Sequence, residues 1–274
     1  MTKKIVIWCG EAANQKALVS KIAAQYSIAG IVIEKKKNPS SKKKLLSLPG
    51  KILDRLRFNS IYSAWKDLQQ RYNEQYPAWP QGKIHITDSI NTKETEAFTR
   101  EISPDLIIVS GTSLIKEPLL SIPVTIGIIN LHTGLSPYVK GGPNCTNWCI
   151  VNNDWHLVGN TIMWINAGID SGNIITSETI DIRMTASLLE AQRKVMEHAH
   201  ELYISVLHYL LNTPPPYISV GQSTLASGKI FYTKMWTAEK RSILLRNWQK
   251  RKMAQLSPSP KTIPLPLFSV INRE

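Results

Sequence analysis

Three polar residues have the types and the spacing that chemistry on a carbonyl group would need. Asn130 and His132 stand two apart at the end of the apolar run 125–132, and Asp170 follows in the segment "AGIDSG". An amide and an imidazolium are good donors to an oxygen on which negative charge develops during acyl transfer. A nearby carboxylate can orient the imidazole, keep it protonated and accept the proton that an attacking amine loses. The trio therefore predicts acyl transfer to an amine without a side-chain nucleophile.

Each of these residues also has an ordinary structural interpretation. An Asn at a strand end often forms a turn, a single His is most often a satisfied core or surface residue, and an Asp beside Gly often forms an Asx turn. The joint pattern is more specific: a buried strand, Asn-x-His, a turn rich in Gly and Pro, then a strand and Asp-x-Gly. Because residues i and i+2 of a strand face the same side, Asn130 and His132 can point at one ligand.

The elements that would position the trio alternate between buried strands and helices. Apolar runs predict strands at 4–10, 27–34, 83–87, 104–111, 125–132, 156–166 and 174–182. Helical spacing predicts helices at 11–26, 61–76, 91–101 with Asn91 as N-cap, from 142 or 143 onward, and 185–211. We therefore predict an α/β fold, a Rossmann-like open, mostly parallel sheet with helices on both faces, plus a small C-terminal helix and hairpin extension. In such sheets ligands bind beyond the C-terminal ends of the strands, where the run 125–132 delivers its polar pair.

Composition divides the 274 residues into a main domain and an appendage. We expect a catalytic domain over 1–184, and a long helix with a basic extension over 185–274. Residues 35–57 are basic and contain Pro39, Pro49 and Gly50, which predicts a long exposed insertion within the main domain. Beyond the long helix, the segment "SGKIFYTKMW" is expected to form a hairpin arm, followed by a basic helix and a Pro-rich end from 257.

Several familiar chemistries are disfavoured by what the sequence lacks. The turn "CGEAANQ" after the first strand has no Gly-x-Gly-x-x-Gly, and no phosphate-loop or Gly-x-Ser-x-Gly motif occurs elsewhere. Three irregularly spaced cysteines make neither a disulfide framework nor a zinc site, so we expect a reducing compartment and no metal. No run approaches the ~20 apolar residues of a membrane span, and the N-terminus is a poor signal peptide. We expect a cytoplasmic protein without a membrane partner.

A family resemblance adds to the prediction of acyl transfer to an amine. The segment "NLHTGLSPYVKGG" followed by "GNTIMWINAGIDSGNII" resembles the folate-dependent formyltransferase family. The similarity covers about 4–182 and is most specific at Asn130, His132, Pro137, Gly141, Asp170 and Gly172. It implies 10-formyltetrahydrofolate as the formyl donor, with Asn130 and His132 polarising the formyl oxygen and Asp170 assisting proton transfer.

The resemblance also implies which segments would hold the two substrates. The pterin edge would be held through backbone groups of Gly111, Thr112, Ser113, Leu114 and Ile115. A second loop would close over it with Ala167, Gly168, Ile169 and Gly172. The acceptor amine would approach over Gly10, Glu11, Asn14, Pro137, Gly141 and Gly142.

Two features depart from the family pattern. The usual Ser-Leu-Leu-Pro of the turn is here Gly134-Leu135-Ser136-Pro137. The insertion 35–57 and the tail from about 212 match no pattern of the family, so we expect these segments to set the acceptor.

Charge and length leave several acceptors open. The net charge of +13 is ordinarily a solvated surface, but a basic rim would suit an anionic, nucleotide-linked amine. We favour an amino sugar on a nucleotide as the small-molecule acceptor. Methionyl-tRNA remains an alternative, although roughly 60 residues after "NTPPP" are few for that enzyme's C-terminal barrel domain. Glycinamide ribonucleotide, a non-catalytic folate-binding module, and a homodimer formed through the long helix or the basic tail also stay open.

Overall fold

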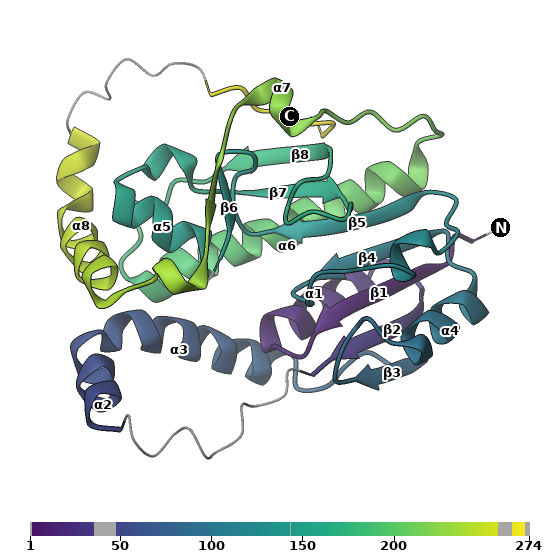
Figure 1. Ribbon diagram of the computed structural model, residues 1–274, viewed down its shortest axis with the longest axis horizontal. Helices are drawn as coiled ribbons and strands as arrows, with labels where there is room; N and C mark the ends of the chain where they lie inside the picture. Colours follow the sequence, from purple (N-terminus) through teal and green to yellow (C-terminus); the bar gives the residue numbers. More distant parts are fainter. Residues whose placement is uncertain (1, 36–47, 143, 257–264, 272–274) are drawn as a thin grey trace.

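A seven-stranded sheet with flanking helices organises the computed structural model, which describes residues 2–35, 48–142, 144–256 and 265–271. The strands are β1 (Ile5–Gly10), β2 (Ile28–Glu34), β3 (Ile84–Thr87), β4 (Leu106–Ser110), β5 (Gly127–His132), β6 (Val139–Gly141), β7 (Gly159–Trp164), β8 (Ile174–Thr179) and β9 (Lys229–Phe231). The helices are α1 (Ala13–Ala23), α2 (Leu48–Arg57), α3 (Asn59–Gln75), α4 (Lys93–Ile102), α5 (Cys145–Asn152), α6 (Leu188–Asn212), α7 (Gln222–Leu225) and α8 (Ala238–Leu256). Figure 1 shows their arrangement.

The strands of the large sheet follow the order β3-β2-β1-β4-β5-β7-β8. The five strands from β3 to β5 are parallel, and β7 and β8 pair antiparallel. The predicted open, mostly parallel sheet is therefore confirmed. Because β4 and β5 are parallel neighbours, their C-terminal ends meet at one edge of the sheet, which is where the Asn-x-His pair lies.

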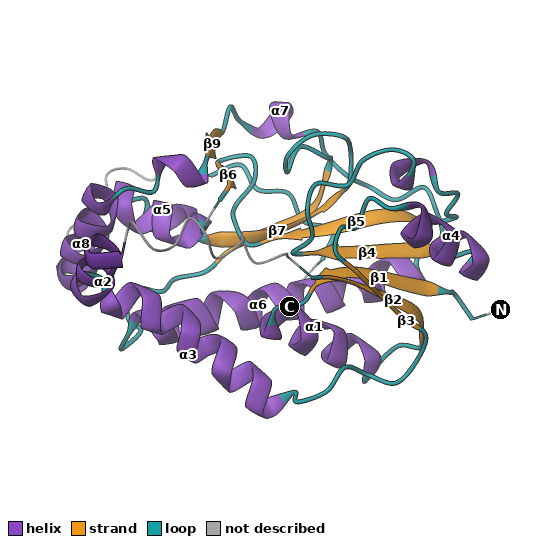
Figure 2. Ribbon diagram, turned by 60° about the horizontal axis from the view of Figure 1, so that its bottom comes forward, coloured by secondary structure: helices purple, strands orange, loops and turns teal. Residues whose placement is uncertain are grey.

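Both faces of the sheet are covered by helices, as predicted. Alternate residues of β1 point to opposite sides, with Ile5 and Ile7 in one apolar cluster and Val6 and Trp8 in another. The first cluster packs against α1 and α6, which Figure 2 shows on one side of the sheet with α3. The second cluster packs against α4 and the segment that follows β4. This buried apolar surface makes the sheet edge a rigid base for a site.

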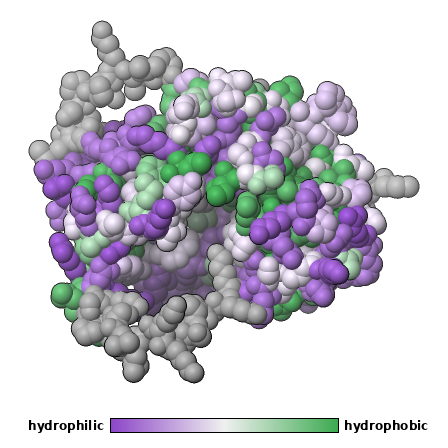
Figure 3. Space-filling view, viewed as in Figure 1, coloured by the Kyte–Doolittle hydropathy of each residue, from purple (hydrophilic) through white to green (hydrophobic). Residues whose placement is uncertain are grey.

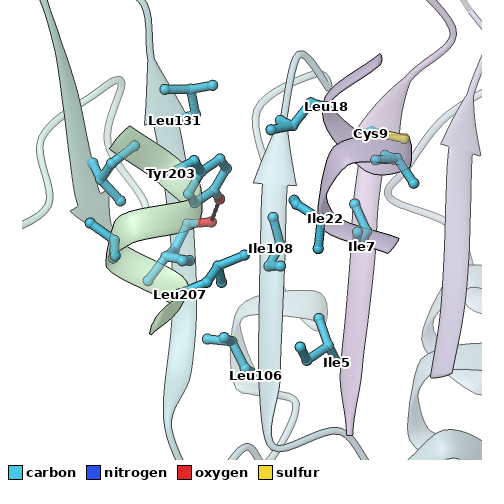
Figure 4. Packing of buried hydrophobic residues seen from close by; sticks show 14 of the residues in the cluster. Ile5, Ile7, Cys9, Leu18, Ile22, Leu106, Ile108, Leu131, Tyr203 and Leu207 are labelled. Carbon is cyan, nitrogen blue, oxygen red and sulfur yellow. Dashed lines mark hydrogen bonds between the residues drawn. The ribbon is translucent and has the colours of Figure 1, made fainter. Parts of the chain in front are cut away.

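Helix α6 is the long helix that the apolar spacing predicts. Ser187 caps it, since its side chain accepts a hydrogen bond from the amide of Glu190. Its apolar face lies against the sheet, and Figure 4 shows Tyr203 and Leu207 packed beside strand residues. The fully buried Tyr203 hydroxyl bonds to the backbone of Val109 and donates to the carbonyl of Ile129. It thereby ties β4 to β5 just before their functional ends.

Three expectations about local structure need correction. The cap of α4 is Thr92, whose side chain accepts from the amide of Thr95; Asn91 instead bonds to Leu114 and Lys116. Residues 229–231 form no hairpin arm, because β9 pairs in parallel with β6. Part of the basic insertion is helical, since residues 48–57 form α2. Residues 36–47 of the insertion that was expected to be exposed lie outside the described residues.

The C-terminal segment returns to the large sheet. Residues 265–271 approach the outer edge of β8, where Thr176 bridges Ser269 and the amide of Ser177 donates to the carbonyl of Phe268. The predicted basic helix is α8, which packs on α5 in a cluster that contains Trp148 and Trp248. Within the described ranges, no helix combines the length and the apolar character needed to cross a bilayer.

Candidate active site

Strand β5 delivers the first two residues of the trio. Asn130 is the last residue of β5 that pairs with β4, opposite Val109, and His132 extends two residues further. His132 is buried, with 7% of its surface exposed, whereas Asn130 is only partly buried. The Asn130 amide makes no hydrogen bond to the described part of the chain, so its donors remain available to a ligand.

Asp170 reaches His132 from the loop between β7 and β8. Its Oδ2 lies 3.3 Å from Nδ1 of His132. Asp170 itself has a left-handed backbone, with φ of 45°, which Asp tolerates better than most residues. Nearby Gly172 is required by packing, because a β-carbon there would lie 1.7 Å from the carbonyl oxygen of Trp164. The Asp-x-Gly spacing thus turns the loop so that the carboxylate faces the imidazole.

The second ring nitrogen of His132 also has an acceptor. Nε2 lies 3.0 Å from the carbonyl oxygen of Val139, and the thiol of Cys145 is 3.6 Å from the same nitrogen. A carbonyl and a carboxylate can only accept, so both nitrogens must carry hydrogen and the ring is an imidazolium. Burial on its own lowers the pKa of His132, but Cys145, Asp170 and the Val139 carbonyl raise it to about 9. The two acceptors around the His132 ring and its raised pKa both indicate that the ring is protonated.

The two oxygens of Asp170 have different surroundings. Oδ2 accepts from the backbone amide of Gly141 at 3.2 Å as well as from His132. Oδ1 has no hydrogen-bond partner within the residues that the structure describes. The backbone of Asp170 is fixed from behind by Gln222, whose amide donates to the carbonyls of Asp170 and Gly172 at 2.8 and 2.9 Å. One carboxylate oxygen is therefore structural and the other can accept a proton.

A cavity of about 670 Å³ opens around the trio. Figure 3 shows that this face of the molecule is hollowed near its centre. The predicted residues that line the cavity are Asn14, Gly111, Thr112, Ser113, Leu114, Ile115, Asn130, His132, Gly141, Gly142, Gly168, Ile169, Asp170 and Gly172. Segments separated by well over one hundred residues thus meet in one space at the sheet edge.

Four predicted binding residues do not line this cavity. Gly10 packs behind it, where a β-carbon would lie 2.6 Å from the carbonyl oxygen of Gly111. Glu11 is exposed, Pro137 is buried in the turn after β5, and Ala167 is exposed outside the lining of the cavity. These four positions shape neighbouring backbone but do not face the cavity.

Comparison with known proteins identifies the family. The model of the formyl transferase family matches residues 3–207. The chain belongs to this family. The match takes in the large sheet and most of α6, so the formyl transferase region extends beyond the sheet into this helix.

The proteins that this chain resembles are named for different formyltransferase activities. A methionyl-tRNA formyltransferase of Clostridium tetani is 31% identical over 120 residues, which are 43% of this chain and 38% of that relative. The chain thus spans about two fifths of that relative's length. A 4-N formyltransferase of Francisella tularensis superimposes with a TM-score of 0.55 at 17% identity, over 90% of this chain and 87% of that one. A sugar 3N-formyltransferase solved with dTDP and 5-N-formyl-tetrahydrofolate gives 0.54 at 17% identity, over 90% and 80%. The two structural likenesses concern the fold.

Several residues in or beside this cavity were missed by sequence reasoning. On the side of Gly111–Ile115, buried Glu34 accepts from the amide of Ser113, and Asn91 holds Leu114 and Lys116. Trp65 of α3 also lines the cavity. So do Gln15, Asn166, Ser171, Met196, Tyr232 and Thr233. None of these has a local signal, because only long-range packing brings them to the sheet edge.

Proposed function

We propose that the protein transfers the formyl group of 10-formyltetrahydrofolate to a primary amine. The single observation that carries this is the convergence of the Asn130 amide, the His132 imidazolium and a free Asp170 oxygen on one cavity. Two of these groups suit a developing oxyanion and the third suits a proton released by nitrogen. No nucleophilic side chain is needed, because the amine itself attacks.

The proposed steps use the chain's residues in a fixed order. Asn130 donates a hydrogen bond to the formyl oxygen, and the positive charge of the nearby His132 imidazolium helps to stabilise the negative charge that forms when the amine nitrogen bonds to the formyl carbon. Asp170 accepts the proton that this nitrogen loses, through Oδ1. When the carbon–N10 bond breaks, the electron pair returns to N10 of tetrahydrofolate, which takes up a proton, and the product is a formamide. The Val139 carbonyl and the Gly141 amide hold the imidazolium and the carboxylate in place throughout.

The donor would occupy the part of the cavity between two loops. Residues Gly111–Ile115 and the residues Gly168, Ile169 and Gly172 of the second loop all line this cavity. The backbone amide of Ser113 is already bonded to Glu34, so this loop is fixed before a ligand arrives. Support for a folate comes from the family match and from the sugar 3N-formyltransferase, which was solved with 5-N-formyl-tetrahydrofolate.

The acceptor that we favour is an amino sugar attached to a nucleotide. The cavity is also lined by Asn14, Trp65 and the segment Ile230–Thr233, which includes Tyr232. These two aromatic side chains are 38% and 47% exposed, so they offer open faces to a flat ring such as a base. Trp65 follows the basic insertion and Tyr232 belongs to the C-terminal extension, the two segments expected to set the acceptor. Methionyl-tRNA is the second candidate, because the curated relatives are named for it.

Assays with a panel of amines test both candidate acceptors. Purified protein would be mixed with 10-formyltetrahydrofolate and, in turn, nucleotide-linked amino sugars, methionyl-tRNA and glycinamide ribonucleotide, while the folate absorbance is followed. We expect turnover with a nucleotide-linked amino sugar. Turnover with methionyl-tRNA alone would reverse the acceptor assignment, and folate binding without turnover of any amine would refute catalysis.

Variants test the assigned roles. We expect Asn130→Ala to lower turnover by about 100- to 1000-fold, the usual effect of losing one oxyanion donor, and Asp170→Ala to nearly abolish it. Asp181→Ala removes an exposed carboxylate that bonds to Arg183 in its own turn, and it should leave activity unchanged. Wild-type activity in Asp170→Ala would contradict its role in proton transfer.

A further inference from the structure

Helix α2 exposes its apolar side chains to solvent. Ile52, Leu53 and Leu56 have 55%, 69% and 71% of their surface exposed, among the highest values for large apolar residues in the described chain. Residues at i, i+1 and i+4 of a helix lie on one face, so the three form a single stripe. Green, hydrophobic atoms are visible at the lower left edge of Figure 3, in the region where Figure 1 places α2.

The polar side of α2 faces the protein. Asp54 accepts hydrogen bonds from Tyr62 of α3 at 2.6 Å and from Arg241 of α8 at 2.7 Å. The guanidinium of Arg57 donates to Ser242 of α8 at 3.2 Å. A surface helix of a globular protein normally buries its apolar stripe and exposes its charges. Here anchoring contacts hold the helix in the reverse orientation, so the outward stripe is part of the fold and not a fraying end.

Positive charge borders the apolar stripe. At 100° per residue, Arg55 projects on one side of the stripe and Arg57 on the other, while Asp54 projects away from it. The whole chain has a net charge of +13, which favours attraction to anionic surfaces. An apolar stripe between cationic flanks is typical of helices that lie in the plane of a membrane interface.

We propose that α2 docks the protein on an anionic membrane surface. Ile52, Leu53 and Leu56 would enter the boundary between headgroups and acyl chains, and Arg55 would pair with lipid phosphates. RNA would use the cations but has no need of an exposed apolar stripe, and a protein partner would not require cations on both flanks. A helix of this kind lies on the membrane surface and does not cross it. The expectation of no membrane partner was based on the lack of a membrane-spanning run, so it did not consider such a helix.

Co-sedimentation with vesicles tests the proposal on the full chain. We expect binding to vesicles that contain phosphatidylglycerol and none to vesicles of phosphatidylcholine alone, with loss of binding as salt rises. Leu53→Ser with Leu56→Ser should abolish binding, and Arg55→Gln should weaken it. Ile218→Ser, which alters another exposed apolar side chain at 64% exposure, is the matched control and should bind normally. Circular dichroism would confirm that each variant is folded.

Other occupants of the stripe give distinct results that would overturn the proposal. If a second copy of the chain covered the stripe, light scattering without lipid would detect a dimer. The double variant Leu53→Ser with Leu56→Ser would then be monomeric. Binding to tRNA that is lost in Arg55→Gln but kept in the leucine variant, without vesicle binding, would indicate a nucleic-acid surface. Vesicle binding unchanged in the leucine variant would also contradict the assignment.

Discussion

The carboxylate of Glu34 bonds to the backbone amide of Ser113, 79 residues further along the chain, at 2.6 Å. Its other oxygen accepts from the amide of Ile90 at 2.9 Å. The side chain is 2% exposed and stands at the end of β2, beside the wall proposed for the folate. Two amides thus satisfy a buried carboxylate, and the carboxylate in turn fixes the loop.

Replacing Glu34 with Gln should loosen this loop. The NH2 of the Gln side chain would face the backbone amide of Ile90 or Ser113, and two donors cannot bond to each other. The lost hydrogen bond should lower the free energy of unfolding by about 1–3 kcal/mol. We expect a KM for the formyl donor raised roughly tenfold, with a smaller change in the KM of the acceptor. Glu201→Gln, at an exposed position on α6, is the control. An unchanged KM for the donor would show that the loop holds its shape without Glu34.

Gly134 explains one departure of the turn from its family pattern. A β-carbon at this position would lie 2.3 Å from Nε2 of His132 and 2.8 Å from Sγ of Cys145. We expect Gly134→Ser to displace the ring and to lower turnover by about 100-fold, the scale of a 1 Å misplacement. Adding Cys145→Ala should restore part of the activity, since the thiol is removed and the ring can shift. A double-mutant cycle measures this coupling, and strict additivity would contradict it.

The pH dependence of stability follows from the pKa of His132. Its folded value of about 9 is above the ordinary 6.5. A raised pKa stabilises the folded state fully below pH ~6.5, and this stabilisation is lost as pH rises through about 9, by at most about 3 kcal/mol. Denaturant titrations of the wild type and His132→Gln should differ most at pH 6 and converge near pH 10. A difference that grows with pH would have the wrong sign for an imidazolium.

Trp65 and Leu114 both line the cavity, with 38% and 43% of their surface exposed. If the acceptor lies against Trp65, Trp65→Ala should raise the KM for the acceptor and leave the KM for the donor unchanged. We expect an increase of about 10- to 100-fold, which is the range for a lost stacking contact with a base. Trp65→Phe should keep most of the affinity. Leu114→Ala should show the reciprocal pattern. Equal effects of both variants on both substrates would mean that the cavity is not divided in this way.

Much of the fold could be read from the chain because its signals are local. The run "LIIVS" of β4 is buried throughout, and such continuous apolar runs mark the parallel strands. Asn130 and His132 could be placed because their strand and their spacing are visible together. Helix α2 was missed, since Pro49, Gly50 and several lysines predict a loop. The fold instead stabilises α2 through contacts with α3 and α8.

The remaining parts of the site depend on distant partners. The parallel pairing of β6 with β9 joins residues about ninety positions apart, and no hydrophobic period reports it. Glu34 is the last residue of a strand and precedes a lysine run, so it looks like an ordinary surface charge. Only its burial between Ile90 and Ser113 reveals its role. Sequence patterns therefore locate the proposed catalytic groups better than the distant residues that fix the loops around the cavity.

The pairing of residues 265–271 with β8 has a practical consequence for work on this protein. Strand β8 is the last strand of the large sheet, and the terminal segment covers the part of its outer edge that follows the bridge between Ile174 and Val220, through contacts at Ser177 and Ser269. An uncovered strand edge is a template for intermolecular aggregation. Shortening the polypeptide before residue 265, or fusing a purification tag there, would unmask that edge and favour insoluble material, so affinity tags belong at the opposite terminus.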